Sequence, residues 1–300
     1  APVGIAITGD SSGNIYVVGV QSGSAGIFYK LNTSGTIVSQ IGLSDTEPRG
    51  IAITSDGEFV LLFWSYSSSV AIARLNSAAT SVVWRFNKNS NQNIQFAYNG
   101  IAIAASGNIY AIGKYNFGGA GNQWLIVKYD SSGTVVWSRR SLYYGTGDSG
   151  LTGIVIDSSE NLYVTGQNGN TPTTRLNKID SGGNFVWGKT IDTGCQSGTV
   201  ALDSTGSYLY LSGTRTSAFK GQFICKFDTS GNIQWQRTLQ YFAFNSNAQM
   251  GGPYAPIRLD SDFMYIALRV DLGQYGATEF AIQKLPLDGS KTGTYTLGVF

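Results

Sequence analysis

Acid–base chemistry in this chain would have to come from the few carboxylates that lie outside tight turns. Most of the 18 acidic residues sit in turn sequences. Six fall in longer connecting segments: Asp45, Glu47, Asp148, Asp192, Asp271 and Glu279. Hydrolysis of a glycosidic bond needs two carboxyl groups within about 10 Å of each other. Because these six are scattered over several segments, we do not expect a catalytic pair.

The chain contains no histidine, and this removes several further chemistries. Ser-His-Asp and Cys-His nucleophilic sites and histidine metal sites are excluded. Cys195 and Cys225 cannot form an ordinary zinc site by themselves; they are two separate thiols, which we favour, or one disulfide. No DxDxDG calcium loop or phosphate-binding glycine loop occurs. We therefore expect no catalytic residue, no metal and no cofactor.

Aromatic side chains in the longer segments are better candidates for a site, and they favour binding. Tyrosine and tryptophan combine a flat apolar face with a polar tip, which suits stacking on sugar rings or packing at a protein interface. For each residue, packing under its own loop is the competing interpretation. The candidate ligand-binding residues are Trp64, Tyr66, Tyr98, Tyr115, Phe117, Tyr143, Tyr144, Tyr241, Phe242, Tyr254 and Tyr275.

These residues must be positioned by a repeated unit with a period of about 50 residues. Its first strand starts six times, near Gly4, Gly50, Gly100, Gly153, Thr199 and Pro256. A polar turn and a second strand follow, in which Tyr16, Tyr110, Tyr163, Tyr210 and Tyr265 take one slot and Val60 takes it in the second unit. Periods of 20 to 50 residues are typical of solenoids and propellers.

The second half of each unit is equally regular. The third strand ends with a basic residue, namely Lys30, Arg74, Lys128, Lys178, Lys226 or Lys284. A glycine turn leads to a fourth strand that carries Trp84, Trp137, Trp187 and Trp235 in four units, with Ser39 and Tyr295 in the outer two. Short apolar strands separated by Asp/Ser/Asn-Gly turns are antiparallel hairpins.

We predict an all-β fold, a six-bladed β-propeller with four antiparallel strands per blade. The blades cover approximately 3–44, 49–88, 99–142, 152–192, 198–240 and 255–300 of a single domain, 1–300. A four-stranded sheet cannot bury both faces alone, and radial packing of six sheets does so. Because the chain starts in a first strand and ends in a fourth, we expect no strand shared between the first and last blades.

The unit resembles the repeats of NHL-type propellers and of the bacterial and phage proteins that carry the SBBP propeller repeat. In that repeat a GIAxDxxGNxYVxG half precedes a KYDxxGxxxW half, as in GIAIAASGNIYAIG and KYDSSGTVVW here. The resemblance covers nearly all 300 residues and is weakest in the sixth unit. It implies a propeller, nominally seven-bladed in that family, and leaves the function open.

Two ends of the blades are expected to differ. The turns between first and second strands and between third and fourth strands are short and uniform. The other connections, including Asn87 to Asn99, Ser141 to Thr152 and Tyr115 to Gln123, are long and varied. Long loops on a rigid scaffold often carry function. We call the end with these connections the loop-bearing end, and we place the aromatic candidates there.

Three sets of residues in the strands each have two interpretations. The basic row could form a cationic ring for an anionic partner, but we favour pairing of each lysine with a turn aspartate such as Asp157 or Asp203. The four tryptophans could be platforms for a ligand, but we favour packing between blades. Arg258 stands where other units have Ala6, Ala52, Ala102, Val155 and Ala201. Its guanidinium either has a buried polar partner or reaches the axial channel of the propeller, which makes Arg258 a possible channel residue.

Composition excludes some partner classes. The net charge is +2, with no basic cluster, so nucleic acid is not expected as a partner. No apolar run approaches 18 residues, so we expect no membrane insertion. The favoured hypothesis is a non-enzymatic recognition module that binds a surface glycan or a protein partner, in an extracellular or virion setting such as a phage adhesin. The alternatives are a structural component of a virion or other larger assembly, and a glycan-cleaving hydrolase or lyase.

Overall fold

A computed structural model describes residues 3–21, 26–43, 47–65, 69–89, 93–116, 122–140, 150–167, 173–193, 195–215, 221–240, 257–271 and 278–290. Every regular element in these ranges is a β-strand. The chain divides into two compact units, 1–151 and 152–300, each with three antiparallel sheets. The predicted single domain stays a prediction.

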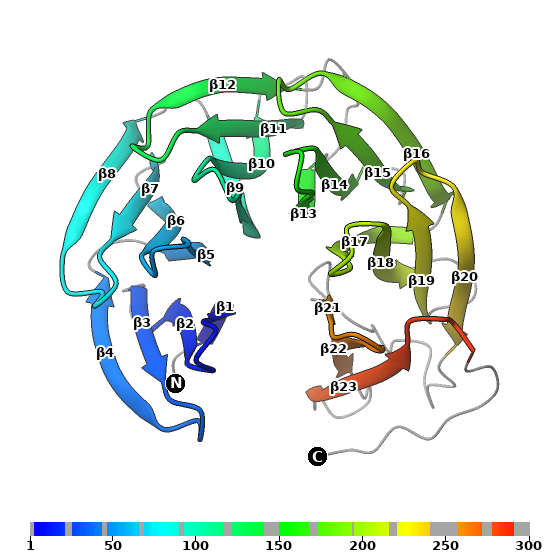
Figure 1. Ribbon diagram of the computed structural model, residues 1–300, viewed down its shortest axis with the longest axis horizontal. Coiled ribbons are helices and arrows are strands. Elements are labelled where there is room, and N and C mark those ends of the chain that lie inside the picture. The colour runs from blue at the N-terminus through cyan, green and yellow to red at the C-terminus, as the bar shows by residue number, and fades with distance from the viewer. Residues whose placement is uncertain are drawn as a thin grey trace. The chain divides into compact units, whose positions relative to one another are not determined.

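The first unit holds three four-stranded sheets, each made of consecutive strands. Figure 1 shows the first strand of each sheet innermost in the unit and the fourth strand outermost. The strands are β1 (Val3–Gly9), β2 (Ile15–Val20), β3 (Gly26–Leu31) and β4 (Ile37–Leu43) in blade 1; β5 (Glu47–Ile53), β6 (Phe59–Ser65), β7 (Ser69–Leu75) and β8 (Val82–Asn89) in blade 2; and β9 (Asn93–Ile103), β10 (Ile109–Asn116), β11 (Asn122–Tyr129) and β12 (Val135–Arg140) in blade 3.

The second unit repeats this order. Its sixth sheet has three strands among the described residues, and Tyr295, expected in the fourth, lies outside them. The strands are β13 (Gly150–Ile156), β14 (Leu162–Gln167), β15 (Thr173–Ile179) and β16 (Phe185–Thr193) in blade 4; β17 (Cys195–Leu202), β18 (Tyr208–Arg215), β19 (Gly221–Asp228) and β20 (Ile233–Gln240) in blade 5; and β21 (Ile257–Leu259), β22 (Phe263–Asp271) and β23 (Thr278–Pro286) in blade 6.

The predicted fold class, an all-β six-bladed propeller of antiparallel sheets, is confirmed. The predicted tyrosine, basic and tryptophan rows face one another across the sheets: Tyr110 pairs with Lys128, which pairs with Trp137. Four of the five tyrosines are buried, with Tyr110 and Tyr163 fully inaccessible, and Tyr265 is partly exposed. The repeat thus encodes a cross-strand ladder that fixes the register of each blade.

One segment was predicted wrongly. We expected residues 87–99 to form a loop between blades, but β8 extends to Asn89 and β9 already begins at Asn93. Ile94 and Phe96 alternate and are buried, as in a strand. An irregularity in the pairing of β9 with β10 follows Phe96 and interrupts the alternation of apolar and polar residues. For this reason the strand could not be recognised from the sequence.

The predicted pairing of lysines with turn aspartates is found as an electrostatic interaction at Lys226 and Lys284, whose charges help to lower the pKa values of Asp288 and Asp260. The turn aspartates accept hydrogen bonds from their own turn: Asp157 accepts from the backbone and side chain of Asn161 and from the Tyr163 hydroxyl. The Lys178 ammonium instead lies 5.1 Å from the centre of the Tyr163 ring. Lys30, Lys128, Lys226 and Lys284 lie over the corresponding tyrosines in the same way.

The second blade differs from the others in its tyrosine slot and in its basic residue. It has Val60 in the tyrosine slot, and its basic residue is Arg74, which forms ion pairs with Asp56 and Glu58. Without a phenol to occupy the turn, the longer guanidinium reaches the carboxylates.

Fourth-strand tryptophans pack on the tight turn of the next blade within each unit. The Trp84 indole donates to the Ser131 carbonyl at 3.3 Å, and the Trp235 indole donates to the Leu287 carbonyl at the same distance. Glycines make room for them: a Cβ on Gly133 would come within 2.5 Å of Phe86 and 3.0 Å of Trp84. A Cβ on Gly231 would lie 3.3 Å from Trp187, and one on Gly289 would lie 3.0 Å from Trp235.

A β-bulge recurs at the start of every described fourth strand. Lys30 pairs with Ser39 and Leu31 with Ile37, so that Val38 is an extra residue, and Val83, Val136, Val186 and Gln234 take its place in the next four blades. The four valines are each at least half exposed. The bulge therefore leaves an exposed residue on the outermost strand of each sheet, and this residue is a valine in four of the five blades.

The contact between a tryptophan and the next turn can be tested at its glycine. Gly133→Ala adds a methyl group against Phe86 and Trp84, whereas Gly35→Ala, at the same turn position with a φ of 78°, meets nothing within 4 Å. Both changes force alanine into the left-handed region, at a cost of about 1 kcal/mol. We expect Gly133→Ala to lower the free energy of unfolding by roughly 1–3 kcal/mol more than Gly35→Ala. Equal losses in urea titrations would contradict the contact.

Turn aspartates predict a loss of stability in acid. The Asn14 side chain donates to Asp10 and lowers its pKa to about 2, outweighing desolvation, with further help from the Tyr16 hydroxyl. The pKa values of Asp130, Asp157, Asp180, Asp228 and Asp260 are lowered as well.

A lowered folded-state pKa contributes stability above the ordinary value near 4 and loses it as the pH falls through the folded value. The thermal midpoint should therefore decline between about pH 4 and pH 2, and Asp10→Asn should flatten part of that decline. A midpoint that is constant over this range would rule the linkage out.

Candidate functional site

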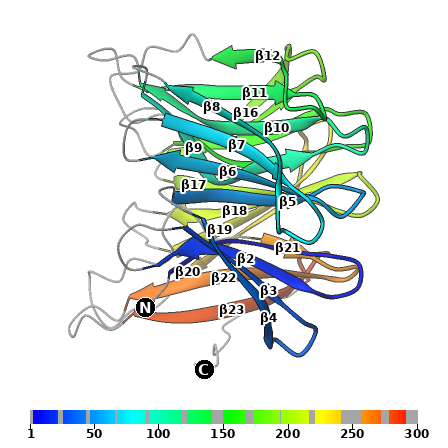
Figure 2. The same ribbon diagram turned by 90° about the vertical axis from the view of Figure 1, so that its left-hand side faces the viewer.

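Two β-bulges at the loop-bearing end of blades 2 and 3 place unusual residues next to each other. In β5, Pro48 pairs with Phe63 and Gly50 with Leu62, which leaves Arg49 as the extra residue. In β9, Phe96 pairs with Gly113 and the regular register resumes only at Ile101, so that Tyr98 lies within the irregular stretch. Bulges redirect side chains and occur often beside functional sites. The tight turns of the first unit lie at the opposite end of its strands (Figure 2).

Arg49 is the centre of this cluster. Its guanidinium nitrogen Nη2 lies 2.9 Å from Oε1 of Glu47, and its Cζ lies 4.1 Å from the centre of the Tyr98 ring and 5.2 Å from that of Trp64. The Tyr98 hydroxyl donates to the same Glu47 oxygen at 3.1 Å. We call these four residues the Arg49 cluster. It brings together two predicted ligand-binding residues, Trp64 and Tyr98, with an acid from the list of loop carboxylates.

The Arg49 cluster is a buried ion pair between two aromatic rings. The side chains of Arg49 and Glu47 are 6% and 12% exposed, respectively. Two charges removed from water are held at low cost only when their geometry and remaining hydrogen bonds are good. Here the carboxylate has two donors and the cation has two ring faces. Nε of Arg49 has no hydrogen-bond partner among the described residues.

Arg49 and Glu47 were not predicted as one unit from the sequence. The residue before the glycine of the first strand differs in each blade: Val3, Arg49, Asn99 and Thr152 in the first four. A charge at a position that is otherwise neutral, two residues after a glutamate, was the available signal. The bulge that makes Arg49 an extra residue shifts the register by a single residue. The period of the repeat therefore does not reveal the bulge.

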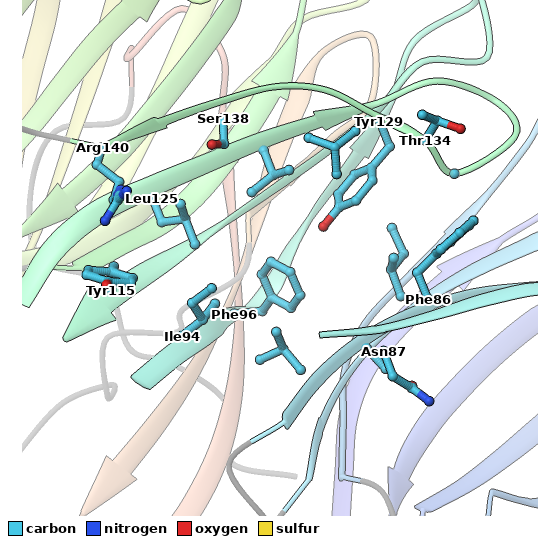
Figure 3. Close-up of a pocket in the computed structure, with 16 residues that line it drawn as sticks. Phe86, Asn87, Ile94, Phe96, Tyr115, Leu125, Tyr129, Thr134, Ser138 and Arg140 are labelled. Carbon is cyan, nitrogen blue, oxygen red and sulfur yellow. The ribbon is translucent and has the colours of Figure 1, made fainter. Parts of the chain in front are cut away.

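Tyr115 is not part of the Arg49 cluster. It is 7% exposed and forms part of the wall of a cavity between blades 2 and 3, where the Arg140 guanidinium lies 4.5 Å from its ring centre (Figure 3). Its burial supports the competing interpretation, in which an aromatic packs under its own segment. Its proposed contact with a ligand stays a prediction.

Arg258 does not form a buried site. Its side chain is exposed on β21, and it donates to the Ile257 carbonyl at 3.1 Å. The first blade also needs a correction at this slot, since Ala6 pairs with Val18 and Thr8 pairs with Tyr16. The remaining ligand-binding candidates lie outside the described residues: Tyr66, Phe117, Tyr143, Tyr144, Tyr241, Phe242, Tyr254 and Tyr275.

Among the described acidic groups, Asp56 and Glu58 come together on the Arg74 guanidinium. Within the described ranges, no group of three or more Cys, Asp or Glu residues is placed to hold a metal ion. Of the six loop carboxylates, Glu47 is the one whose side chain is described, and Arg49 and Tyr98 occupy it. No helix long and apolar enough to span a membrane is found among the described residues.

The coupling inside the Arg49 cluster can be measured directly. Arg49→Met should lower the free energy of unfolding by about 3 kcal/mol, because it leaves the Glu47 carboxylate buried without its cation. Adding Glu47→Gln should restore much of this loss, because no charge then remains in the apolar site. Arg85→Met, at an exposed position on β8, is the control. If the effects of Arg49→Met and Glu47→Gln simply add in a double-mutant cycle, the pair is not coupled.

Comparisons with known proteins support the fold. No protein-family model matches the chain, and no curated protein sequence is significantly similar. The resemblance to SBBP and NHL repeats therefore stays a prediction.

Among solved structures, a chain of hydrazine synthase from Kuenenia stuttgartiensis is 15% identical, with a TM-score of 0.63 over 89% of this chain and 76% of that one. A PL25 ulvan lyase bound to -[GlcA(1-4)Rha3S]- is 11% identical, with a TM-score of 0.59 over 94% and 79%. A chain of a nidogen/laminin complex is 13% identical, with a TM-score of 0.51 over 86% and 89%. At these identities the similarity shows the fold alone.

Proposed function

We propose that the protein is a non-enzymatic recognition module that binds a surface glycan or a protein partner through the loop-bearing end of blades 2 and 3. The Arg49 cluster is the observation that carries this proposal. It fixes Trp64 and Tyr98 at that end of the strands while each ring keeps part of its surface accessible. Rigid aromatic rings next to an arginine are the side chains that contribute most at recognition sites.

The geometry favours binding over catalysis. Glu47 is the acid nearest the rings, and its Oε1 accepts from both Arg49 and Tyr98. A carboxylate held in this way by a cation and a phenol serves to position its neighbours, whereas a general acid must present its proton to a substrate. The hydrolase or lyase alternative therefore has no support from the described residues.

Structural neighbours illustrate the two classes of ligand without assigning either. The ulvan lyase structure holds a polysaccharide fragment, and the nidogen/laminin structure is a complex of two proteins. A role at a cell or virion surface, as an adhesin or as a structural component of a larger assembly, goes with the proposal.

The proposal is tested with the purified chain. We expect it to bind a glycan on an array, or a protein partner on its native surface by crosslinking. Trp64→Leu should weaken that binding by about tenfold, as expected for the loss of an aromatic anchor. Trp235→Leu is the matched control, because this tryptophan lies in another blade, next to a tight turn.

Two results would overturn the proposal. One is a wild-type protein that captures neither a glycan nor a protein. The other is an affinity that falls equally in Trp64→Leu and Trp235→Leu while both variants stay folded.

A further inference from the structure

A cavity of about 310 Å³ lies between blades 2 and 3, apart from the Arg49 cluster. Its walls come from β7 and β8 of blade 2 and from β9, β10, β11 and β12 of blade 3 (Figure 3). Protein interiors rarely leave voids larger than a water molecule, and an apolar cavity of about 150 Å³ is enough to hold benzene. The space between these blades is thus of the size of a ligand site.

Most of the wall is apolar. Ile72, Ile94, Phe96 and Leu125 are buried side chains that line the space. Tyr129 adds a phenol, and burial raises the pKa of this group to about 12, so that it stays neutral. Figure 3 shows its hydroxyl oriented toward the interior. A charged group buried among these side chains would lose its hydration without compensation. The part of a ligand that enters the cavity must therefore be apolar.

One cation is placed at an end of the cavity. Arg140, at the end of β12, is exposed, and its guanidinium lies 4.5 Å from the centre of the buried Tyr115 ring. In the described part of the chain, no carboxylate forms an ion pair with Arg140. The contact holds the guanidinium beside the ring, and its N–H groups can donate to a bidentate anion.

The cavity is lined along β11 from Leu125 to Tyr129. Arg140 pairs with Leu125, four residues before Tyr129 on β11. Four residues of an extended strand span about 14 Å, which is the separation along β11 between the backbone position paired with Arg140 and that of Tyr129. Figure 3 shows Arg140 with Tyr115 at one end and Tyr129 with Thr134 at the other.

We propose that this cavity binds a linear fatty acid, with the carboxylate on Arg140 and the acyl chain between blades 2 and 3 along Ile72, Phe96 and Leu125. The size, the apolar wall and the single cation at one end each match a part of this ligand. The site is independent of the recognition surface, since it needs neither Trp64 nor Tyr98.

The test uses the full chain with dodecanoate below its micellar concentration, and isothermal titration calorimetry. Dodecanoate should bind and raise the thermal midpoint, because a ligand of the native state stabilises it. Arg140→Ala should weaken binding by roughly tenfold, through loss of a charge-assisted bidentate contact. Arg139→Ala is the matched control: this neighbouring side chain is also exposed, and its guanidinium lies over Trp137, outside the cavity wall.

A second variant and a second probe separate the acyl chain from its carboxylate. Ile72→Phe fills the space and should abolish binding of dodecanoate, while the folded state is checked by circular dichroism. Dodecanol, which lacks the charge, should bind to the wild type more weakly than dodecanoate does. The two ligands should bind to Arg140→Ala with equal affinity.

Three results would overturn the proposal: no binding of dodecanoate, binding that survives Ile72→Phe in a folded protein, or equal losses in Arg139→Ala and Arg140→Ala.

Discussion

Contact between a fourth-strand tryptophan and the tight turn of the following blade is the interaction on which the rest of each unit depends. A four-stranded sheet leaves both faces exposed, and it becomes stable only when a neighbour covers them. Trp84 spans that boundary with its ring against Gly133 and its indole nitrogen on the Ser131 carbonyl. Because the same contact recurs between blades 5 and 6, the tight-turn end is uniform. The loop-bearing end is thereby left to vary.

The uniform end was predictable from the sequence because it is encoded in repeated residue types. The tyrosine, basic and tryptophan rows recur with a constant spacing, and the structure places Tyr110, Lys128 and Trp137 side by side in register. The spacing could not tell which partner a lysine takes. That outcome depends on competition for the turn carboxylate, which the local amides and the Tyr163 hydroxyl occupy at Asp157. The lysine then lies on the tyrosine face, which is close and already ordered.

The candidate site was only partly predictable, since it depends on departures from the repeat. Trp64 and Tyr98 were predicted as ligand-binding residues, but the guanidinium that holds both comes from Arg49 on a bulge of β5. A bulge shifts one residue and leaves the apolar pattern on both sides intact. The same holds for the cavity, which arises from side chains of six strands and has no signature in any one segment. Long-range packing of this kind is a property of the folded unit.

The bulged valines of the outermost strands have a consequence for how copies of this protein behave at high concentration. Val38, Val83, Val136 and Val186 expose apolar surface on the strand that has no hydrogen-bonded neighbour on its outer side. A flat edge of this composition would recruit the edge of a second molecule and start a fibrous aggregate. The extra residue interrupts the ladder of backbone donors and acceptors and twists the edge. Deleting one of these valines would restore a continuous row of backbone donors and acceptors. The edge strand could then pair with the edge of a second molecule and start polymerisation.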